Sequence, residues 1–192
     1  MEKSKTSEKK IFHATSREKW RQWLEQHFLE ERLVWLLFPR KSANIESVSY
    51  SDAVEEALCF GWIDSTMKTY DDQFYMQRFS VRNPKSTYSQ LNRERLLWLH
   101  QHNLIHPSII PSVLPEIQKT YSLPSDIIET LQQDPMVWEH FLQFSDSYKR
   151  IRLAYIEAAR SRPEEFAKRL NYFVSMTKAN KLIIARGSEK YY

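Results

Sequence analysis

The chain has 192 residues, 42% of them hydrophobic, which is enough to bury a core in one compact domain or in a domain with a helical extension. It contains only two glycines, where average usage would give about a dozen. This scarcity excludes the glycine-rich loops of P-loop, dinucleotide-binding and kinase proteins, and also the GxSxG elbow of serine hydrolases. The net charge is only +4, and the single cysteine excludes both an intrachain disulfide and a cysteine-rich zinc site.

The first third of the chain combines helix and strand signals. Residues 1–10 are charged and lack an apolar stretch, so we expect a disordered lead-in rather than a secretory signal. A capping box formed by Thr15 and Glu18 predicts the start of an amphipathic helix. The apolar run Leu33–Phe38, stopped by Pro39, predicts a buried strand, because it is short and continuous.

A second short helix and a hairpin follow. Asp52 and the acidic residue three positions later indicate the start of that helix, and Gly61 is predicted to end it with a positive φ. The segments Trp62–Thr69 and Phe74–Val81 then have strand composition. The four polar residues between them predict a hairpin turn.

The remainder of the chain is predicted to be helical. Helices are expected over about 89–102, and from starts near Asp134, Asp146 and Pro163, with several prolines between the first two. Strands followed by helices indicate an α+β fold with a small, mostly antiparallel sheet of about three strands covered by helices, and a helical C-terminal half. We expect an α+β region at 11–103 and a helical region at 104–192, packed together as one compact unit.

Residues that could hold a metal ion or cofactor have weak patterns. His100, His102 and His106 are near in sequence, but the first two point about 200° apart on a helix. Surface or helix-end histidines are the simpler interpretation, and Cys59 lies in an apolar context typical of a buried residue. The sequence therefore predicts no metal site and no cofactor.

A ligand-binding segment is predicted where the hairpin leads into the next helix. Arg78 and Arg82 could bind an anion together with the amides of a helix start, and Asp64 could orient one of the arginines. The alternative is that Asp64 and an arginine form a structural pair, with Ser86 or Ser89 serving only as a cap. The predicted ligand-binding residues are Trp62, Asp64, Arg78, Arg82, Ser86, Ser89 and Asn92.

The blocks Tyr50–Asp64 and Arg78–Asn92 resemble the two signatures of the bacterial YdeI/OmpD-associated, or bacteriocin-protection, family. The segment Arg162–Leu170 is similar to a basic motif in that family's C-terminal helices. The resemblance implies a stress protein that gives tolerance to bacteriocins or cationic peptides. It implies no catalytic residue.

Three functions remain open at this point. The first is a non-enzymatic tolerance protein with a pocket for a small anionic ligand or a protein partner. The second is an enzyme acting on a small anionic metabolite, with Asp64 as general base or Ser86 as nucleophile, although no histidine accompanies that serine. The third is nucleic-acid binding through residues 145–192, which carry 11 basic and 5 acidic residues, a net +6. The sequence predicts a cytoplasmic protein without a membrane span.

Overall fold

The computed structural model describes residues 10–184 and 187–192. The predicted lead-in at residues 1–10 falls outside this range, apart from its last residue. The chain forms two compact units, and each is described by itself. The α+β unit runs up to Ser86 and includes Asn103–Ile110, while the helical unit comprises Thr87–His102 and Pro111–Tyr192. The helix expected near residue 89 therefore belongs to the helical unit rather than to the α+β region.

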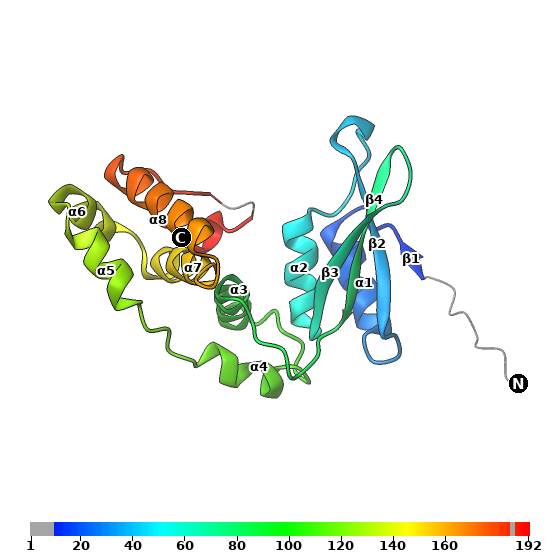
Figure 1. Ribbon diagram of the computed structural model, residues 1–192. Coiled ribbons are helices and arrows are strands. Elements are labelled where there is room, and N and C mark those ends of the chain that lie inside the picture. The colour runs from blue at the N-terminus through cyan, green and yellow to red at the C-terminus, as the bar shows by residue number, and fades with distance from the viewer. Residues whose placement is uncertain (1–9, 185–186) are drawn as a thin grey trace, which may run out of the picture. The chain divides into compact units, whose positions relative to one another are not determined.

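The α+β unit contains a four-stranded sheet in the order β1-β2-β4-β3 (Figure 1). The pair β2–β4 and the pair β3–β4 are antiparallel, whereas β1 pairs with β2 in parallel. The α+β class with a mostly antiparallel sheet is confirmed, with four strands in place of about three. The strands are β1 Ile11–Phe12, β2 Leu33–Pro39, β3 Trp62–Thr69 and β4 Phe74–Val81.

Two helices cover one face of this sheet, α1 (Arg17–His27) and α2 (Tyr50–Cys59). The Trp20 ring of α1 packs edge-on against Phe79 of β4, with ring centroids 5.4 Å apart. Its indole nitrogen donates to the carbonyl oxygen of Ala53 in α2 at 3.0 Å, which joins the two helices. Because side chains alternate along a strand, the residues that face these helices are every second one.

The starts of α1 and α2 differ from the predicted caps by one and three residues. Ser16, not Thr15, is the N-cap of α1, and its hydroxyl accepts from the amide of Lys19 at 3.3 Å. Ser49, not Asp52, caps α2, and Asp52 lies in the first turn. In both cases a serine hydroxyl directly before the helix reaches the free amides, whereas Thr15 lies one residue before the cap and Asp52 lies inside the helix.

Gly61 joins α2 to β3 with φ 71°, as its position after the helix predicts. The conformation is in the left-handed region, where a side chain would be strained. A Cβ built on this residue would lie 3.2 Å from the Cδ1 atom of Ile109. The glycine is therefore required both by the turn and by the close approach of the returning segment.

Among the described residues, the helical unit contains α3, five further α-helices and a short 3-10 helix at Glu189–Tyr191. Each of α3, α6 and α7 begins after a polar residue whose side chain accepts from a first-turn amide, namely Ser89, Asp134 and Ser145. The helices are α3 Gln90–Gln101, α4 Ile110–Ile117, α5 Ser125–Gln132, α6 Pro135–Gln143, α7 Asp146–Glu157 and α8 Pro163–Lys178. The first residue of α4 is assigned to the α+β unit.

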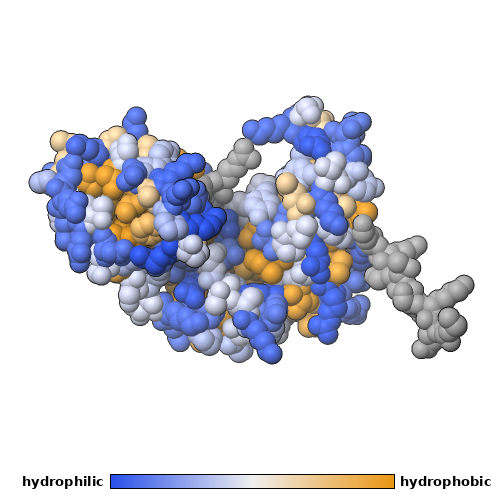
Figure 2. Space-filling view, in the orientation of Figure 1, coloured by the Kyte–Doolittle hydropathy of each residue, from blue (hydrophilic) through white to orange (hydrophobic). Residues whose placement is uncertain are grey.

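The core of the helical unit is formed by buried apolar side chains from α5 to α8. It consists of Ile127, Leu131, Val137, Phe141, Tyr148, Leu153, Ile156 and Phe173. Hydrophobic side chains also remain on one surface over the region of α5–α8, bordered by hydrophilic ones (Figure 2). Among the described residues, no helix has the length and apolar character needed to cross a membrane.

Candidate functional site

Asp64, the predicted orienting carboxylate, lies on the helix-covered face of the sheet. Its Oδ2 atom accepts from the Tyr50 hydroxyl at 2.5 Å and from the Gln77 side-chain amide at 3.3 Å. The same Gln77 nitrogen also donates to the carbonyl oxygen of Ser65 at 3.2 Å. Among the described residues, no arginine forms an ion pair with Asp64.

Trp62 and Arg78 are positioned differently from each other. Trp62 is only 1% exposed, and its indole nitrogen donates to the carbonyl oxygen of Phe28 at 3.4 Å, so it contributes to the core. Arg78 pairs with Trp35 of β2, whereas Asp64 pairs with Phe79. Since neighbouring residues of β4 point to opposite faces, Arg78 and Asp64 lie on opposite faces of the sheet.

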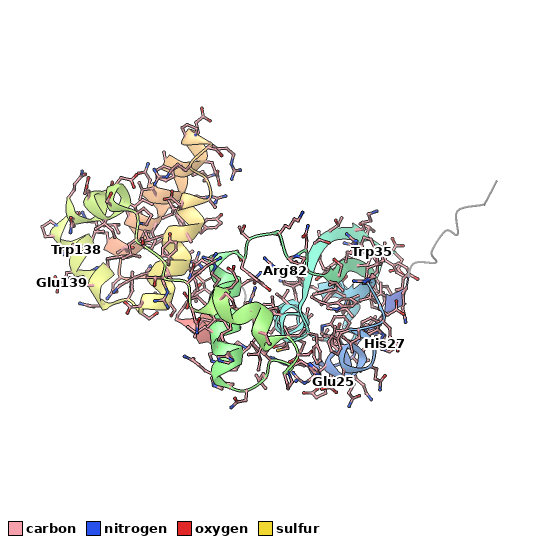
Figure 3. All side chains as sticks on the ribbon, turned by 90° about the horizontal axis from the view of Figure 1, so that it is seen from below. Glu25, His27, Trp35, Arg82, Trp138 and Glu139 are labelled. Atoms are coloured by element: carbon pink, nitrogen blue, oxygen red, sulfur yellow. The ribbon has the colours of Figure 1, made fainter. Side chains whose placement is uncertain are left out.

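Arg82 lies on the segment that follows β4 (Figure 3), and Ser86 follows it four residues later. The Arg82 guanidinium donates to the main-chain carbonyl oxygen of Ser86. The Ser86 hydroxyl donates to the carbonyl oxygen of Asn83 at 2.7 Å. These bonds hold a surface turn together, and the serine hydroxyl has no histidine among its hydrogen-bond partners in the described chain.

Ser89 and Asn92 belong to the helical unit, not to the α+β unit that holds the other five predicted residues. Ser89 is the N-cap of α3, and its hydroxyl accepts from the Asn92 amide at 3.3 Å. The Asn92 side-chain oxygen accepts from Arg95 at 2.9 Å. The cap role considered as the alternative for Ser89 is therefore present, and the seven-residue ligand site stays a prediction.

A cavity lies within the helical unit. Its volume is about 910 Å³, within the range of small-molecule sites. The start of α3, the segment before α5, and helices α7 and α8 form its walls. Its aromatic lining residues are Tyr88, Tyr121, Tyr155, Tyr172 and Phe173, and its charged lining residues are Arg93, Arg152, Glu157, Glu165, Lys168 and Arg169. Ser89 is the single residue of the seven predicted ones among those that line it.

Two exposed aromatic side chains line this cavity. Tyr155 and Tyr172 are 52% and 55% exposed. The Arg169 guanidinium lies 3.9 Å from the centroid of the Tyr155 ring and donates to the Tyr155 carbonyl oxygen at 2.7 Å. The ring is thereby fixed beside the cavity and not folded into the core.

Three buried polar atoms of the lining residues have no hydrogen-bond partner among the described residues. They are the Tyr121 hydroxyl oxygen, the Gln90 side-chain oxygen and the Arg152 Nε atom. Burial, and then the negative charge of Glu157, raise the pKa of Tyr121 to about 12, so its hydroxyl stays protonated at neutral pH. Unpaired buried polar groups are rare in folded proteins and cost free energy, which a bound ligand would recover.

The remaining charges around the cavity are mostly paired. Arg93 and Glu116 form an ion pair at 3.2 Å, and Arg169 and Glu165 form one at 2.7 Å. The hydrogen bond from Arg169 holds the pKa of Glu165 below its usual value. These carboxylates are therefore paired with arginines and do not present a free negative charge to a ligand in the cavity.

The described residues offer no group of three histidine, cysteine or acidic side chains that could hold a metal ion. His102 contacts the Trp98 carbonyl oxygen at 2.8 Å, and His106 contacts the Ser108 hydroxyl at 2.8 Å, so each ring has a local partner. Burial, and then the charge of Glu56, raise the pKa of the Cys59 thiol to about 12. A thiol in that state is a poor nucleophile.

Comparison with known families divides the chain at nearly the same place as the structure does. Residues 12–111, just over half of the 192-residue chain, match the family model described as Domain of unknown function (DUF8412). The chain belongs to this family. Residues 120–180 match the model described as Bacteriocin-protection, YdeI or OmpD-Associated, which confirms the resemblance to that family. No curated protein and no solved structure gives a significant match.

The position of the second match is informative. The resemblance rests mainly on Tyr50–Asp64 and Arg78–Asn92, but both blocks lie within the part matched by DUF8412. The bacteriocin-protection match instead covers α5 to α8, including the basic motif at Arg162–Leu170. Most residues that line the cavity lie in this matched part, although the start of α3 does not. Lys168 and Arg169 belong to that motif and line the cavity, so the motif is the part of the sequence that could have located it.

Proposed function

We propose that this protein gives tolerance to bacteriocins or cationic peptides, and that it acts by binding a small ligand rather than by catalysis. The observation that carries the proposal is the tyrosine-lined cavity of about 910 Å³ in the helical unit. This cavity lies mainly in the segment that matches the bacteriocin-protection model, whose name supplies the biological role.

The lining favours a ligand with an apolar or aromatic body. Tyrosine rings and the aliphatic residues of α7 provide the walls, and a few polar groups can fix the orientation of the ligand. Aromatic faces pack against aromatic or aliphatic surface and shield it from water. No nucleophile with a paired base is needed for such a role, and binding alone gives the site its function.

The seven predicted residues remain a second element of this proposal. Ser89 contributes to the cavity wall, and Arg82 and Ser86 form a surface turn in the other unit. An interaction of Arg78 and Arg82 with a small anion or a protein partner is a separate hypothesis for the α+β unit. The two hypotheses predict different perturbed residues, so one mapping experiment distinguishes them.

Filling the cavity tests the proposal. Ala154 of α7 lines the cavity, and Ala154→Trp should weaken binding of phenylnaphthylamine, an uncharged fluorescent aromatic probe, by about tenfold or more because the ring occupies the ligand's space. Ala167→Trp on the exposed side of α8 is the matched control and should retain wild-type affinity. Probe fluorescence measures the affinity, and circular dichroism verifies the fold.

The same variants link binding to tolerance. A sensitive bacterium that expresses the wild-type protein or Ala167→Trp should grow at a higher bacteriocin concentration than one that expresses Ala154→Trp. If Ala154→Trp does not fold, Ala158→Trp at the exposed C-cap of α7 also narrows the cavity. No probe binding by the wild-type protein, or equal binding by the folded filled variant, would overturn the proposal.

A further inference from the structure

Arg152 is a buried cation that lines the cavity. It lies on α7 and is only 7% exposed. One terminal nitrogen donates to the Tyr192 hydroxyl at 2.6 Å, while the Nε atom has no partner among the described residues. The guanidinium carbon lies 5.7 Å from the centroid of the Tyr148 ring and 5.9 Å from that of Tyr192.

No carboxylate of the described residues pairs with Arg152. Its neighbour in the sequence, Arg150, shows the contrast, since it forms a two-point ion pair with Glu94 at 2.6 and 2.9 Å. The other arginines of the lining, Arg93 and Arg169, also have acidic partners. A guanidinium removed from water without an anion is unfavourable, and two tyrosine rings replace only part of its hydration.

An anionic ligand bound beside Arg152 would supply the acidic partner that this arginine lacks among the described residues. The free Nε–H group of Arg152 is a donor, and guanidinium binds carboxylate, sulfonate or phosphate oxygens in preference to neutral acceptors. The lining of the same cavity includes apolar side chains and the exposed rings of Tyr155 and Tyr172. A ligand that fits this cavity therefore needs an apolar part to contact the walls and an anionic group to bind Arg152.

We infer that the ligand of this cavity is an amphipathic anion whose apolar body lies between the tyrosines and whose anionic group binds Arg152. This rests on the proposed function, because it presupposes that the cavity takes a ligand. Elsewhere in the lining, the unpaired Gln90 oxygen can accept a hydrogen bond from the ligand, and the unpaired Tyr121 hydroxyl can donate one. The inference assigns the charge class of the ligand and the residue that selects it.

Two probes of matched shape separate charge from hydrophobic contact. Anilinonaphthalene sulfonate carries a sulfonate that its uncharged analogue phenylnaphthylamine lacks. The wild-type protein should bind the sulfonate about tenfold or more tightly, since a buried ion pair replaces an unpaired charge. This comparison needs no variant and so does not depend on the fold of a mutant.

Arg152→Gln then identifies the residue. It should weaken binding of the sulfonate probe by about tenfold or more, while binding of the uncharged probe changes less than about twofold. Arg162→Gln is the matched control, because it removes the same charge from an exposed side chain of the same unit that does not line the cavity, and it should have little effect on either probe. Near-ultraviolet circular dichroism confirms that both variants keep their packing.

Each outcome has one meaning. Failure of the wild-type protein to bind either probe contradicts the proposed function and the inference together. Binding of both probes with equal affinity, or equal loss of both in Arg152→Gln, contradicts the inference alone and assigns Arg152 a structural role. If Arg152→Gln does not fold, Arg152→Lys replaces it, because lysine retains the positive charge. This variant should still bind the sulfonate probe more tightly than the uncharged one, but by a smaller factor than the wild-type protein. Full wild-type affinity for the sulfonate probe would contradict a role for the geometry of the guanidinium.

Discussion

Two polar side chains that line the cavity are buried in a way that lowers the stability of the fold. The Tyr121 hydroxyl and the Arg152 Nε atom are buried without partners among the described residues. In a protein selected only for packing, such groups would be replaced by apolar ones or given partners. Both residues line the same cavity, which supports the proposal that a ligand supplies the missing partners.

Tyr121 tests whether an unpaired polar group in the cavity lowers stability and contributes to ligand binding. Tyr121→Phe removes a buried hydroxyl that has no partner among the described residues, so the free energy of unfolding should rise by about 1 kcal/mol. Affinity for the sulfonate probe should fall at the same time, because the ligand loses a hydrogen bond. Denaturant unfolding and probe titration measure the two quantities, and a loss of stability without a change in affinity would contradict this role.

The roles of some individual residues could be predicted from the sequence alone. Gly61 is predicted correctly, because helix-ending chemistry and a positive φ depend on local sequence. The roles of Trp62 and Asp64 could not be predicted, since burial against Phe28 and hydrogen bonding to Tyr50 depend on segments far away in the chain. Arg152 has no sequence signal of its own, because its importance comes from the absence of an acidic partner in space.

At the level of elements, strands and helices with strong periodicity are predicted well. The hairpin strands Trp62–Thr69 and Phe74–Val81 have the predicted bounds, and the helix start at Asp134 is correct because proline follows the cap. The two-residue strand β1 is too short to have an alternating pattern. The caps of α1 and α2 are misplaced because several neighbouring polar residues could each accept the first amides.

Ion pairs between helices of the helical unit predict its response to acid. Asp134, the N-cap of α6, pairs with Lys178 of α8 at 2.7 Å, and Asp126 of α5 pairs with Arg160 at 2.9 Å. Hydrogen bonds from these cations hold the pKa of both carboxyls below their usual value. A carboxyl group with a lowered folded-state pKa stabilises the fold above its unfolded pKa, and this contribution is lost as the pH falls through the folded value.

The melting temperature should therefore be nearly constant from about pH 7 to about pH 5, and should fall once the pH drops below about 4, the unfolded value of aspartate. Asp134→Asn should reduce the size of this fall, because one of the titrating ion pairs is removed. Differential scanning calorimetry over this range measures the effect. A melting temperature that stays unchanged or rises below about pH 4 would show that these pairs do not contribute.

At the level of the whole molecule, two compact units coincide closely with two family matches. The α+β class and the helical C-terminal half could be predicted from the order of strand and helix patterns. The transfer of α3 to the helical unit could not, because the chain leaves the α+β unit at Ser86 and returns at Asn103. The predicted site was therefore placed on one continuous segment that the fold divides between two units.

The central claim is that the helical unit binds an amphipathic anion in its cavity. Backbone-amide chemical-shift perturbation with anilinonaphthalene sulfonate tests it most directly, because it reports on both units in one titration. We predict saturable shifts concentrated at residues 88–93, 121, 151–158 and 165–173, which include the walls of the cavity. Shifts confined to residues 62–86 of the α+β unit would contradict the claim and favour the site around Arg78 and Arg82.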